Sequence, residues 1–489
     1  MARQANITLV QAPLVSRLAP CNGLALIKAH LQAAGISARI HDASLNLRRG
    51  IKAAGLRWHE YQLTDADHLF DALAASLPEF LPAFIDKEAQ SVLSGAPDVV
   101  GFTVQYATEA CSLALARRIK ELSPGTAVVF GGPQCIRETK AFELAESPWV
   151  DAVALGEADL SFVEFARVFN PESRVIPHIP GFLVKEKGRV LDFGDPPEFK
   201  NLDELPFMDF SGFEMDAYRA DSLFMVASRG CVRKCSFCTE IVQRKTYRRM
   251  SAERILAEIR HQLRRYPDRC FVRFDDSLIN GDVRLVARLS ELLAPFRLEM
   301  AVRRASRDFG WGGMAILHPT MTASLLKKMR QGGCQTLAYG FESGSQKVVD
   351  LMRKGFKVEE AQRIIRDTHA AGIRVQLFVM VGYPGETDRD FRQTLDFLER
   401  NEEAIDIVSV SMCGLLKGSH IAVNHAQYGA VPHPTDARLW SSADGTNTPA
   451  VRQARHQAVF DAIRRLGFQA SEDSPIIMEK NPESALCVG

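Results

Sequence analysis

Three cysteines gather within one short segment of the chain, Ser228-Arg-Gly-Cys-Val-Arg-Lys-Cys-Ser-Phe-Cys-Thr239. They are Cys231, Cys235 and Cys238, in the spacing C-x₃-C-x₂-C, and no fourth cysteine stands nearby. Iron–sulfur clusters normally take four protein thiolates, so three would leave one iron of a [4Fe–4S] cluster open to an outside ligand. A structural zinc site is the alternative, but it takes four ligands, usually as two separated pairs. The segment therefore predicts a cluster that binds and acts on another molecule.

Around this segment the sequence alternates strand and helix patterns about six times, which predicts a partial (β/α)₆ TIM-type barrel over residues 221–419. In such barrels the chemistry lies at the carboxyl ends of the strands. The distinctive polar clusters follow expected strands there: Asp275-Asp276, Arg303, Gly340–Ser345 and Gly382–Glu386. The expected strands are 224–228, 271–274, 298–302, 336–339, 375–381 and 407–411.

Residues 1–165 predict a separate doubly wound, Rossmann-like α/β domain. Its expected strands are apolar throughout and separated by helical patterns, which is typical of a parallel sheet covered on both faces. They are residues 7–10, 99–104, 127–130 and 152–155. A helical insertion is expected at 45–96, a proline-rich linker at 166–220, and a C-terminal cap at 420–489.

Ligands of doubly wound sheets collect at the carboxyl ends of the strands. Glycines at those ends let a flat or phosphate-bearing ligand approach the backbone, and a hydroxyl supplies a donor. Taken alone, such residues are also ordinary connections between strand and helix. The candidates here are Thr103, Gln105, Gly131, Gly132, Pro133, Gly156 and Glu157.

The bulk composition is typical of a soluble cytoplasmic enzyme. Sixty basic and 59 acidic residues give a formal charge of +1, so no nucleic-acid partner is expected. No apolar run reaches the length of a membrane span, and the N-terminal residues lack the apolar region of a signal peptide. Ten cysteines in 489 residues are too few for a disulfide scaffold, and cluster thiols belong in a reducing compartment.

These motifs together resemble the radical S-adenosylmethionine (SAM) enzymes, in particular the branch that carries a cobalamin (B12)-binding domain. Beside the cysteine segment, the resemblance rests on Tyr339-Gly-Phe-Glu-Ser-Gly-Ser-Gln346, Phe378-Val-Met-Val-Gly-Tyr-Pro-Gly-Glu-Thr387 and Phe274-Asp-Asp-Ser277. The doubly wound domain stands directly upstream, as in that branch. The Asp-x-His-x-x-Gly element of many cobalamin proteins is absent from residues 1–165, so cobalt is expected to have no histidine below it.

The resemblance implies a [4Fe–4S] cluster, SAM on its open iron, and cobalamin in the first domain. Phe237, Met380 and Tyr383 would line the adenine, and Glu342, Ser343 and Gly344 would contact the ribose. Asp275 or Asp276 would bind the methionyl amine, and Arg303 would pair with a carboxylate of SAM or substrate. Three alternatives stay open: Glu342 as a helix N-terminal acid, Met380 as core, and Arg303 in a rim salt bridge.

The implied function is methylation of an unactivated carbon by way of methylcobalamin and a 5′-deoxyadenosyl radical. A radical cyclase, ring-rearranging or C–C-coupling enzyme, with or without cobalamin, is the closest alternative. A cobalamin- or zinc-binding protein without catalysis is the alternative from another class. The expected partners are a small-molecule or peptide substrate and an electron donor such as flavodoxin or ferredoxin.

Overall fold

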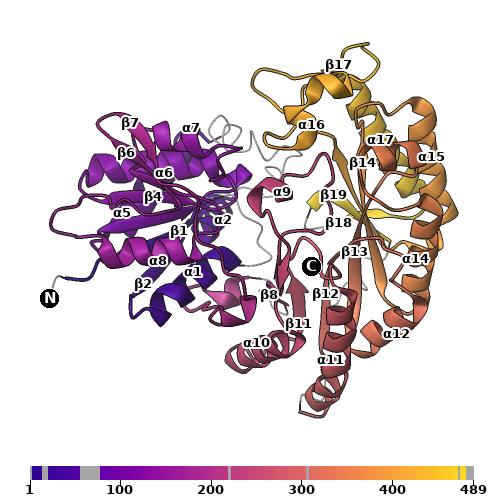
Figure 1. Ribbon diagram of the computed structural model, residues 1–489, viewed down its shortest axis with the longest axis horizontal. Helices are drawn as coiled ribbons and strands as arrows, with labels where there is room; N and C mark the ends of the chain where they lie inside the picture. The colour runs from indigo at the N-terminus through magenta and orange to yellow at the C-terminus, as the bar shows by residue number, and fades with distance from the viewer. Residues whose placement is uncertain are drawn as a thin grey trace. The chain divides into compact units, whose positions relative to one another are not determined.

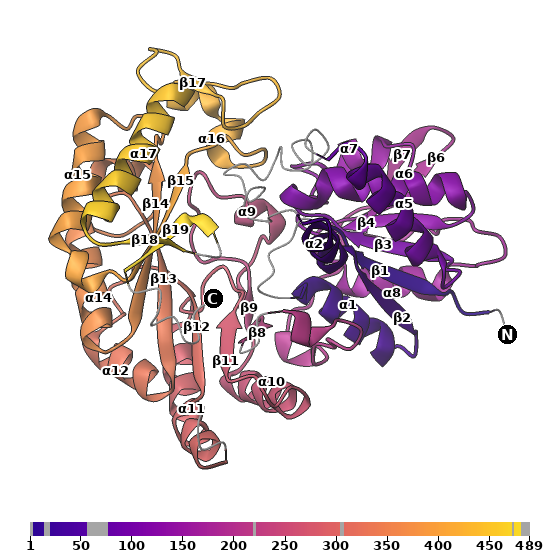
Figure 2. The ribbon, with the colours of Figure 1, turned by 180° about the vertical axis from the view of Figure 1, so that it is seen from behind.

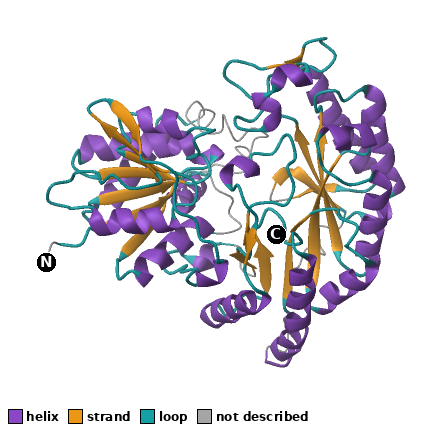
Figure 3. Cartoon of the chain, viewed as in Figure 1, coloured by secondary structure: helices purple, strands orange, loops and turns teal. Residues whose placement is uncertain are grey.

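The computed structural model describes residues 3–13, 20–55, 77–218, 222–303, 308–471 and 474–480. These residues divide into two compact units, residues 1–220 and 221–489. Each unit is a layered α/β structure built on its own sheet (Figures 1 and 3). Among the described residues, no helix combines the length and apolar character that crossing a membrane would require.

The sheet of the first unit contains parallel strands in the order β2-β1-β3-β4-β5. That order reverses between β1 and β3, as in doubly wound sheets, which bind ligands outside such a point. The strands are buried along most of their length because both faces are covered. They are β1 Ile7–Gln11, β2 Ala38–Asp42, β3 Val99–Thr103, β4 Ala127–Gly131 and β5 Ala152–Ala154.

Helices cover both faces of this sheet. Helices α1 and α8 pack together on one face, and α5 and α6 pack together on the other (Figure 1). The expected insertion at 45–96 contains most of α2 and all of α5, whereas residues 56–76 lie outside the described residues. The helices are α1 Asn22–Ala33, α2 Ala43–Ala53, α5 Phe80–Leu93, α6 Glu109–Leu122, α7 Ala141–Glu146 and α8 Asp159–Val168.

The expected linker at 166–220 is wrong in part, because it contributes two strands to the first sheet. Strand β6 (Phe182–Glu186) pairs antiparallel with β5, and β7 (Arg189–Asp192) pairs antiparallel with β6. The turn between them is Lys187-Gly188, and both residues have positive φ. Two such residues form the tight turn that favours a hairpin. The prolines that suggested a linker flank this hairpin rather than interrupt it.

The second unit contains six parallel strands in the order β8-β11-β12-β13-β14-β15, with β19 and β18 added antiparallel beyond β15. The strands expected at 271–274, 336–339, 375–381 and 407–411 are confirmed. The strands are β8 Ser222–Met225, β11 Phe271–Phe274, β12 Gly310–Ala315, β13 Cys334–Glu342, β14 Arg374–Val381, β15 Ile407–Met412, β18 Gln469–Ser471 and β19 Ser474–Glu479.

One face of this sheet is covered by helices α10, α11, α12, α14, α15 and α17 (Figures 1 and 2). Helix α15 is strongly amphipathic, with Phe391, Phe397 and Leu398 buried, and a capping box of Thr387 and Asp390 begins it. The helices are α9 Glu240–Gln243, α10 Ala252–Arg265, α11 Val283–Arg303, α12 Ala323–Gln331, α13 Gln346–Leu351, α14 Val358–Ala370, α15 Asp388–Arg400, α16 His420–Val423 and α17 Pro449–Arg465.

The expected strand at 298–302 is wrong. Those residues form the last part of helix α11, and the third parallel strand is β12 instead. Short apolar runs fit a strand or a helix equally well. Strand β12 reads Gly-Trp-Gly-Gly-Met-Ala, a composition with low strand propensity. Gly312 is needed there because a Cβ atom would lie 2.8 Å from the carbonyl oxygen of Thr336.

The first expected strand also differs in extent, because 224–228 is split. Strand β8 ends at Met225, and Ser228–Arg229 form a separate short strand, β9, paired antiparallel with β10 (Arg248–Arg249). The expected cap at 420–489 holds α16, α17 and a small hairpin of β16 (Ala430–Val431) and β17 (Ser441–Ser442). It also supplies β18 and β19 to the main sheet.

Candidate functional site

The cysteine loop follows β8 and β9 in the second unit. Cys235 is buried, Cys231 and Cys238 are partly buried, and none of the three is in a disulfide. The backbone N–H of Arg233 donates to the Cys231 sulfur and that of Glu240 to the Cys238 sulfur, each at 3.4 Å. Burial raises the pKa of all three thiols, that of Cys238 to about 11. Without a metal the thiols are therefore protonated, and metal binding must release protons.

The loop fits an iron–sulfur cluster better than a single metal ion. It supplies three thiols, whereas a structural zinc ion takes four ligands, usually as two separated pairs. In a [4Fe–4S] cluster the thiolates bind different irons, and hydrogen bonds to the sulfurs are common. The donors from Arg233 and Glu240 match that pattern.

Asp276 supports the chain that leads into this loop. Its carboxylate accepts from the backbone N–H of Ala227 at 3.1 and 3.0 Å, from the Ser228 hydroxyl at 2.5 Å, and from the Ser228 N–H. The side chain is 2% exposed. Burial raises its pKa to about 7, although these hydrogen bonds act to lower it. Of the Asp pair expected at the methionyl amine, Asp276 thus points into the protein, whereas Asp275 is exposed after β11.

Ser236 ties the cysteine loop to the two strand ends that carry the other motifs. Its hydroxyl lies 2.6 Å from the Tyr383 hydroxyl and 3.3 Å from the carbonyl oxygen of Leu351, and its N–H donates to Met352 at 3.0 Å. Its carbonyl accepts from the N–H of Ile421 at 2.9 Å. The cysteine loop, the segment after α13 and the loop after β14 are therefore one hydrogen-bonded assembly.

Glu342 ends β13 in a left-handed conformation, with φ of 68°. Its carboxylate forms a buried ion pair with Lys354, whose Nζ lies 3.1 Å from Oε1. Burial acts to lower the pKa of Lys354, but Glu342 and Cys235 oppose it, and the net pKa is raised. The same Nζ lies 5.5 Å from the ring centroid of Phe237. Glu342 is thus held by a lysine beside the cysteine loop, which is a different role from the helix N-terminal acid considered as the alternative.

Ser343 and Gly344 are packed against helix α15. The Ser343 hydroxyl lies 3.2 Å from that of Thr394, which accepts from the N–H of Gly344 at 3.0 Å. A Cβ atom on Gly344 would lie 2.4 Å from the carbonyl oxygen of Gln393. Both residues therefore fix the turn after Glu342, and their side-chain positions face the helix.

Phe237, Met380 and Tyr383 lie in one apolar cluster. Phe237 and Met380 are partly buried at its edge, and Tyr383 is fully buried. This placement leaves the first two available to an adenine, whereas the Tyr383 hydroxyl is taken up by Ser236 and Leu351. The buried members are Val348, Met352, Tyr383, Cys413, Leu415, Ile421, Ala430 and Trp440.

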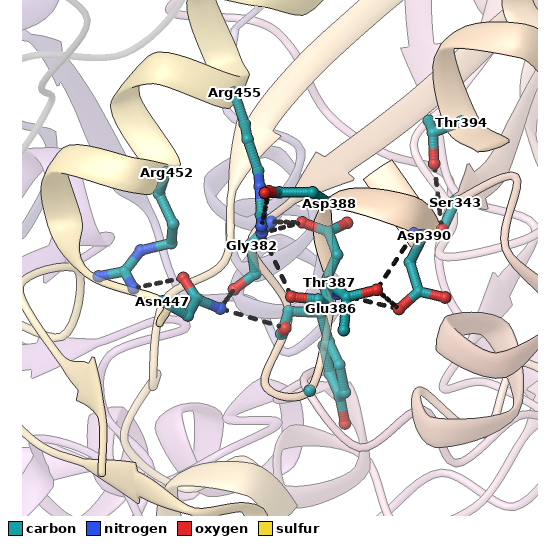
Figure 4. A network of polar contacts seen from close by, with 12 residues as sticks. Ser343, Gly382, Glu386, Thr387, Asp388, Asp390, Thr394, Asn447, Arg452 and Arg455 are labelled. Atoms are coloured by element: carbon teal, nitrogen blue, oxygen red, sulfur yellow. Dashed lines mark hydrogen bonds and ion pairs between the residues drawn. The ribbon is translucent and has the colours of Figure 1, made fainter. Parts of the chain in front are cut away.

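The C-terminal helix α17 grips the loop after β14 through two arginines (Figure 4). Arg455 donates to Glu386 Oε2 at 2.9 Å and to Asp388 at 2.8 Å, and the Arg455 and Glu386 side chains are 7% and 1% exposed. Glu386 in turn accepts from the N–H of Gly382 at 2.7 Å. Arg452 occupies the space above Gly382, where a Cβ atom would lie 2.2 Å from its Cγ.

Asn447 completes this grip. Its side-chain NH₂ donates to the carbonyl oxygens of Gly382 at 3.0 Å and Tyr383 at 3.3 Å, and its Oδ1 accepts from Arg452 at 3.1 Å (Figure 4). The sequence does not predict a role for Asn447, Arg452 or Arg455, because a helical pattern with scattered basic residues is typical of a solvent-exposed helix face. Asn447-Thr-Pro, at the start of α17, is the one signal that marks this junction.

Arg303 does not stand where it was expected. It is the last residue of α11, which leads into the amino end of β12. Helices of a strand–helix alternation run back from the carboxyl ends of the strands, so the end of α11 lies at the opposite edge of the sheet. The expected pairing of Arg303 with a carboxylate of SAM or substrate therefore has no support from its backbone position.

The candidate residues of the first unit do lie together. Thr103 pairs with Gly131 in the parallel register of β3 and β4, and the N–H of Val104 donates to Gly131 at 2.6 Å. Gln134 donates to Val104, and Gly156 donates to Cys135, so the connections after β3, β4 and β5 form one edge. Along this edge Pro133 is exposed, while Gln105, Gly131, Gly132, Gly156 and Glu157 are partly buried and Thr103 is buried.

Comparison with known proteins identifies the segment that carries the cysteine loop. Residues 225–398 match the family model described as the radical SAM superfamily. The chain is 25% identical over 389 residues to an uncharacterized methyltransferase of Pyrococcus horikoshii, an alignment that covers 78% of this chain and 77% of the relative. It is 21% identical over 323 residues to the anaerobic magnesium-protoporphyrin IX monomethyl ester cyclase of Cereibacter sphaeroides. That alignment covers 63% of this chain and 50% of the relative.

A solved structure resembles both units. It is the radical SAM methyltransferase TsrM from Kitasatospora setae, determined with cobalamin and a [4Fe–4S] cluster bound. The TM-score is 0.66 at 15% sequence identity, and the match covers 93% of this chain and 85% of that one. At this identity the likeness establishes a shared fold.

Proposed function

We propose that the protein is a cobalamin-dependent radical SAM enzyme that methylates an unactivated carbon, from the premise that residues 225–398 match the radical SAM superfamily. One observation carries the proposal. The loop of Cys231, Cys235 and Cys238 is hydrogen-bonded through Ser236 to the end of β14, and Lys354, ion-paired with Glu342 at the end of β13, lies beside Phe237 of that loop. The three motifs expected to hold cluster and SAM thus meet in the second unit.

The chemistry that the bound groups would supply is an electron from the cluster, a 5′-deoxyadenosyl radical from SAM, and a methyl carrier in cobalamin. The chain itself binds and orients. Three thiolates would hold three irons and leave the fourth for SAM, and Phe237 and Met380 would provide apolar surface for its adenine. Glu342, pre-positioned by Lys354, would accept from the ribose hydroxyls.

Cobalamin would bind at the shared edge of β3, β4 and β5 in the first unit. The strand order reverses beside β3, and ligands of doubly wound sheets bind outside such a point. Thr103, Gln105, Gly131, Gly132, Pro133, Gly156 and Glu157 would face its nucleotide tail or ring. The cobalamin reported in TsrM, which shares the fold, supports this proposal.

A radical cyclase or another rearranging enzyme without methyl transfer is the second candidate. It is favoured by the similarity to the magnesium-protoporphyrin monomethyl ester cyclase, whereas the relative from Pyrococcus horikoshii is named a methyltransferase. No described residue separates the two. Either enzyme would act on a small molecule or peptide and would need an electron donor such as flavodoxin or ferredoxin.

The test is a turnover experiment with protein purified without oxygen after growth with B12. Iron and cobalt are counted, and candidate substrates are incubated with SAM labelled in its methyl group. Methyl transfer predicts a product in which a labelled methyl group has replaced one hydrogen atom of the substrate. A turned-over product without the label, together with 5′-deoxyadenosine, would support the cyclase candidate instead. Iron-loaded protein that never carries cobalt would contradict both the cobalamin proposal and the proposed methyl transfer, and it would leave the radical SAM assignment intact.

A further inference from the structure

We propose that Lys354 is a fixed positive charge that sets the reduction potential of the cluster, with Glu342 as the counter-charge that tempers it. The inference rests on the proposed cluster at the cysteine loop. It adds a role for two residues that ligate no iron.

The geometry places Lys354 directly against the loop. Its Nζ lies 5.5 Å from the centroid of Phe237, the residue that stands between Cys235 and Cys238 in the loop. Its side chain is 10% exposed, so solvent screens its charge weakly. Gly340 leaves room for the amine, because a Cβ atom there would lie 2.8 Å from Nζ.

The backbone on both sides of Lys354 packs against and hydrogen-bonds to the same loop. Met352 accepts from the N–H of Ser236, and Leu351 accepts from its hydroxyl. Arg353 and Gly355 have positive φ of 59° and 69°. Arg233 of the loop packs over Gly355, where a Cβ atom would lie 2.4 Å from its Nη1. These contacts fix the backbone that carries Lys354 against the cysteine loop.

The sign of the effect follows from charge. Reduction adds one negative charge to the cluster, so a nearby cation stabilises the reduced form and makes the potential less negative. Glu342 carries the opposite charge 3.1 Å from the Lys354 Nζ, so it acts on the potential in the opposite direction. Removing the lysine should therefore make the potential more negative, and neutralising the glutamate should make it less negative.

The test is a redox titration of reconstituted protein, followed by electron paramagnetic resonance in the absence of SAM. The variants are Lys354→Met, Glu342→Gln and the double variant, with Lys354→Arg as the conservative replacement. We expect the reduction potential of Lys354→Met to be more negative than that of wild type and the potential of Glu342→Gln to be less negative. The potential of the double variant should lie between those two, and that of Lys354→Arg should be close to wild type. Lys347→Met is the matched control, because Lys347 is half exposed and pairs with Asp390. Its potential should stay that of wild type.

Iron and sulfide contents separate the possible failures. Wild-type protein without a cluster would contradict the proposed function itself. Cluster-loaded Lys354→Met and Glu342→Gln variants with unchanged potentials, or with shifts in the same direction, would overturn the role of Lys354 and leave the cluster assignment intact. Opposite shifts could not come from loosened packing alone, because a structural defect has no reason to change sign with the charge removed. If Lys354→Met does not load iron, the double variant and Glu342→Gln still decide the question, since they must lie in the stated order.

Discussion

The hydroxyl of Ser236, between two cluster cysteines, lies 2.6 Å from the hydroxyl of Tyr383 at the end of β14. The tyrosine also donates to the carbonyl oxygen of Leu351 at 3.1 Å. The buried Tyr383 hydroxyl therefore links the loop after β14 to the cysteine loop through Ser236. It also links that loop, through Leu351, to the segment that carries Lys354. Tyr383, which the sequence predicts at the adenine, is thus also a fixed point between three parts of the site.

Tyr383→Phe should destabilise this junction without removing a ligand. A buried hydrogen bond contributes about 0.5–1.5 kcal/mol, so losing two should lower the free energy of unfolding by about 1–3 kcal/mol. Denaturant unfolding of the two proteins measures this. The iron content after reconstitution should stay near that of wild type, and SAM affinity should fall. Unchanged stability and SAM affinity would mean that the contact with Ser236 is incidental.

Asp276 should make stability depend on pH. Burial raises its pKa from 3.8 to about 7 in the folded protein, whereas the unfolded chain keeps the ordinary value. Between these values the folded protein holds a proton that the unfolded chain has lost, so the free energy of unfolding from this group falls as pH rises from about 4 to about 7 and is flat above.

Asp276→Asn should remove that slope, which cannot exceed about 1.4 kcal/mol per pH unit for one group. Denaturant unfolding near pH 5 and pH 7 gives the slope for each protein. Asp275→Asn is the comparison variant: the slope should persist over a narrower pH range, because the charge of Asp275 makes the smallest contribution to the raised pKa of Asp276. Equal slopes for wild type and Asp276→Asn would contradict the assignment of the proton to Asp276.

Arg455→Ala should disturb SAM binding from the C-terminal helix. It leaves the Glu386 carboxylate buried without its cation, and breaking a buried ion pair in this way costs about 3–5 kcal/mol. Glu386 also anchors the N–H of Gly382, so the loop after β14 should loosen and SAM affinity should drop while the cysteines stay intact. Arg464→Ala, an exposed position on the same helix, should leave SAM affinity unchanged. Equal SAM affinities for the two variants would contradict the proposed effect of the Arg455–Glu386 contact on SAM binding.

Gly132→Ala should destabilise the first unit. Its φ of 101° is unfavourable for any side chain, and a Cβ atom would lie 2.9 Å from the N atom of Val104 and from the Thr103 hydroxyl. The change therefore tests the edge itself rather than an open pocket. Thermal unfolding should show a lower midpoint, and cobalamin loading should fall with it. Gly188→Ala, where a Cβ atom meets nothing within 4 Å, controls for positive φ alone.

The sequence could predict those elements whose pattern is local. Strands β11, β13, β14 and β15 are apolar runs bounded by turn residues, and the cysteine loop follows directly from its spacing. Strand β12 could not be predicted from the sequence. Gly312 is required for its close approach to β13, and glycine has a low strand propensity. Because the third parallel strand is β12 and not residues 298–302, Arg303 does not follow a strand and does not lie at the carboxyl edge of the sheet.

Other parts of the site depend on contacts between distant segments. Arg455 meets Glu386 across 69 residues, and Asp276 meets Ser228 across 48, so no local pattern distinguishes these buried charges from solvated ones. The hairpin β6–β7 is a different case. Lys187-Gly188 between two apolar runs is a local turn signal, and the surrounding prolines outweighed it.

The most direct test of the central claim is the electron paramagnetic resonance spectrum of the reconstituted, reduced protein with and without SAM. Three thiolates and an open iron predict the signal of one reduced [4Fe–4S] cluster, with a shape that changes when SAM is added, and its loss in Cys235→Ala. A folded protein that gives no cluster signal, or whose signal is the same with and without SAM, would contradict the account.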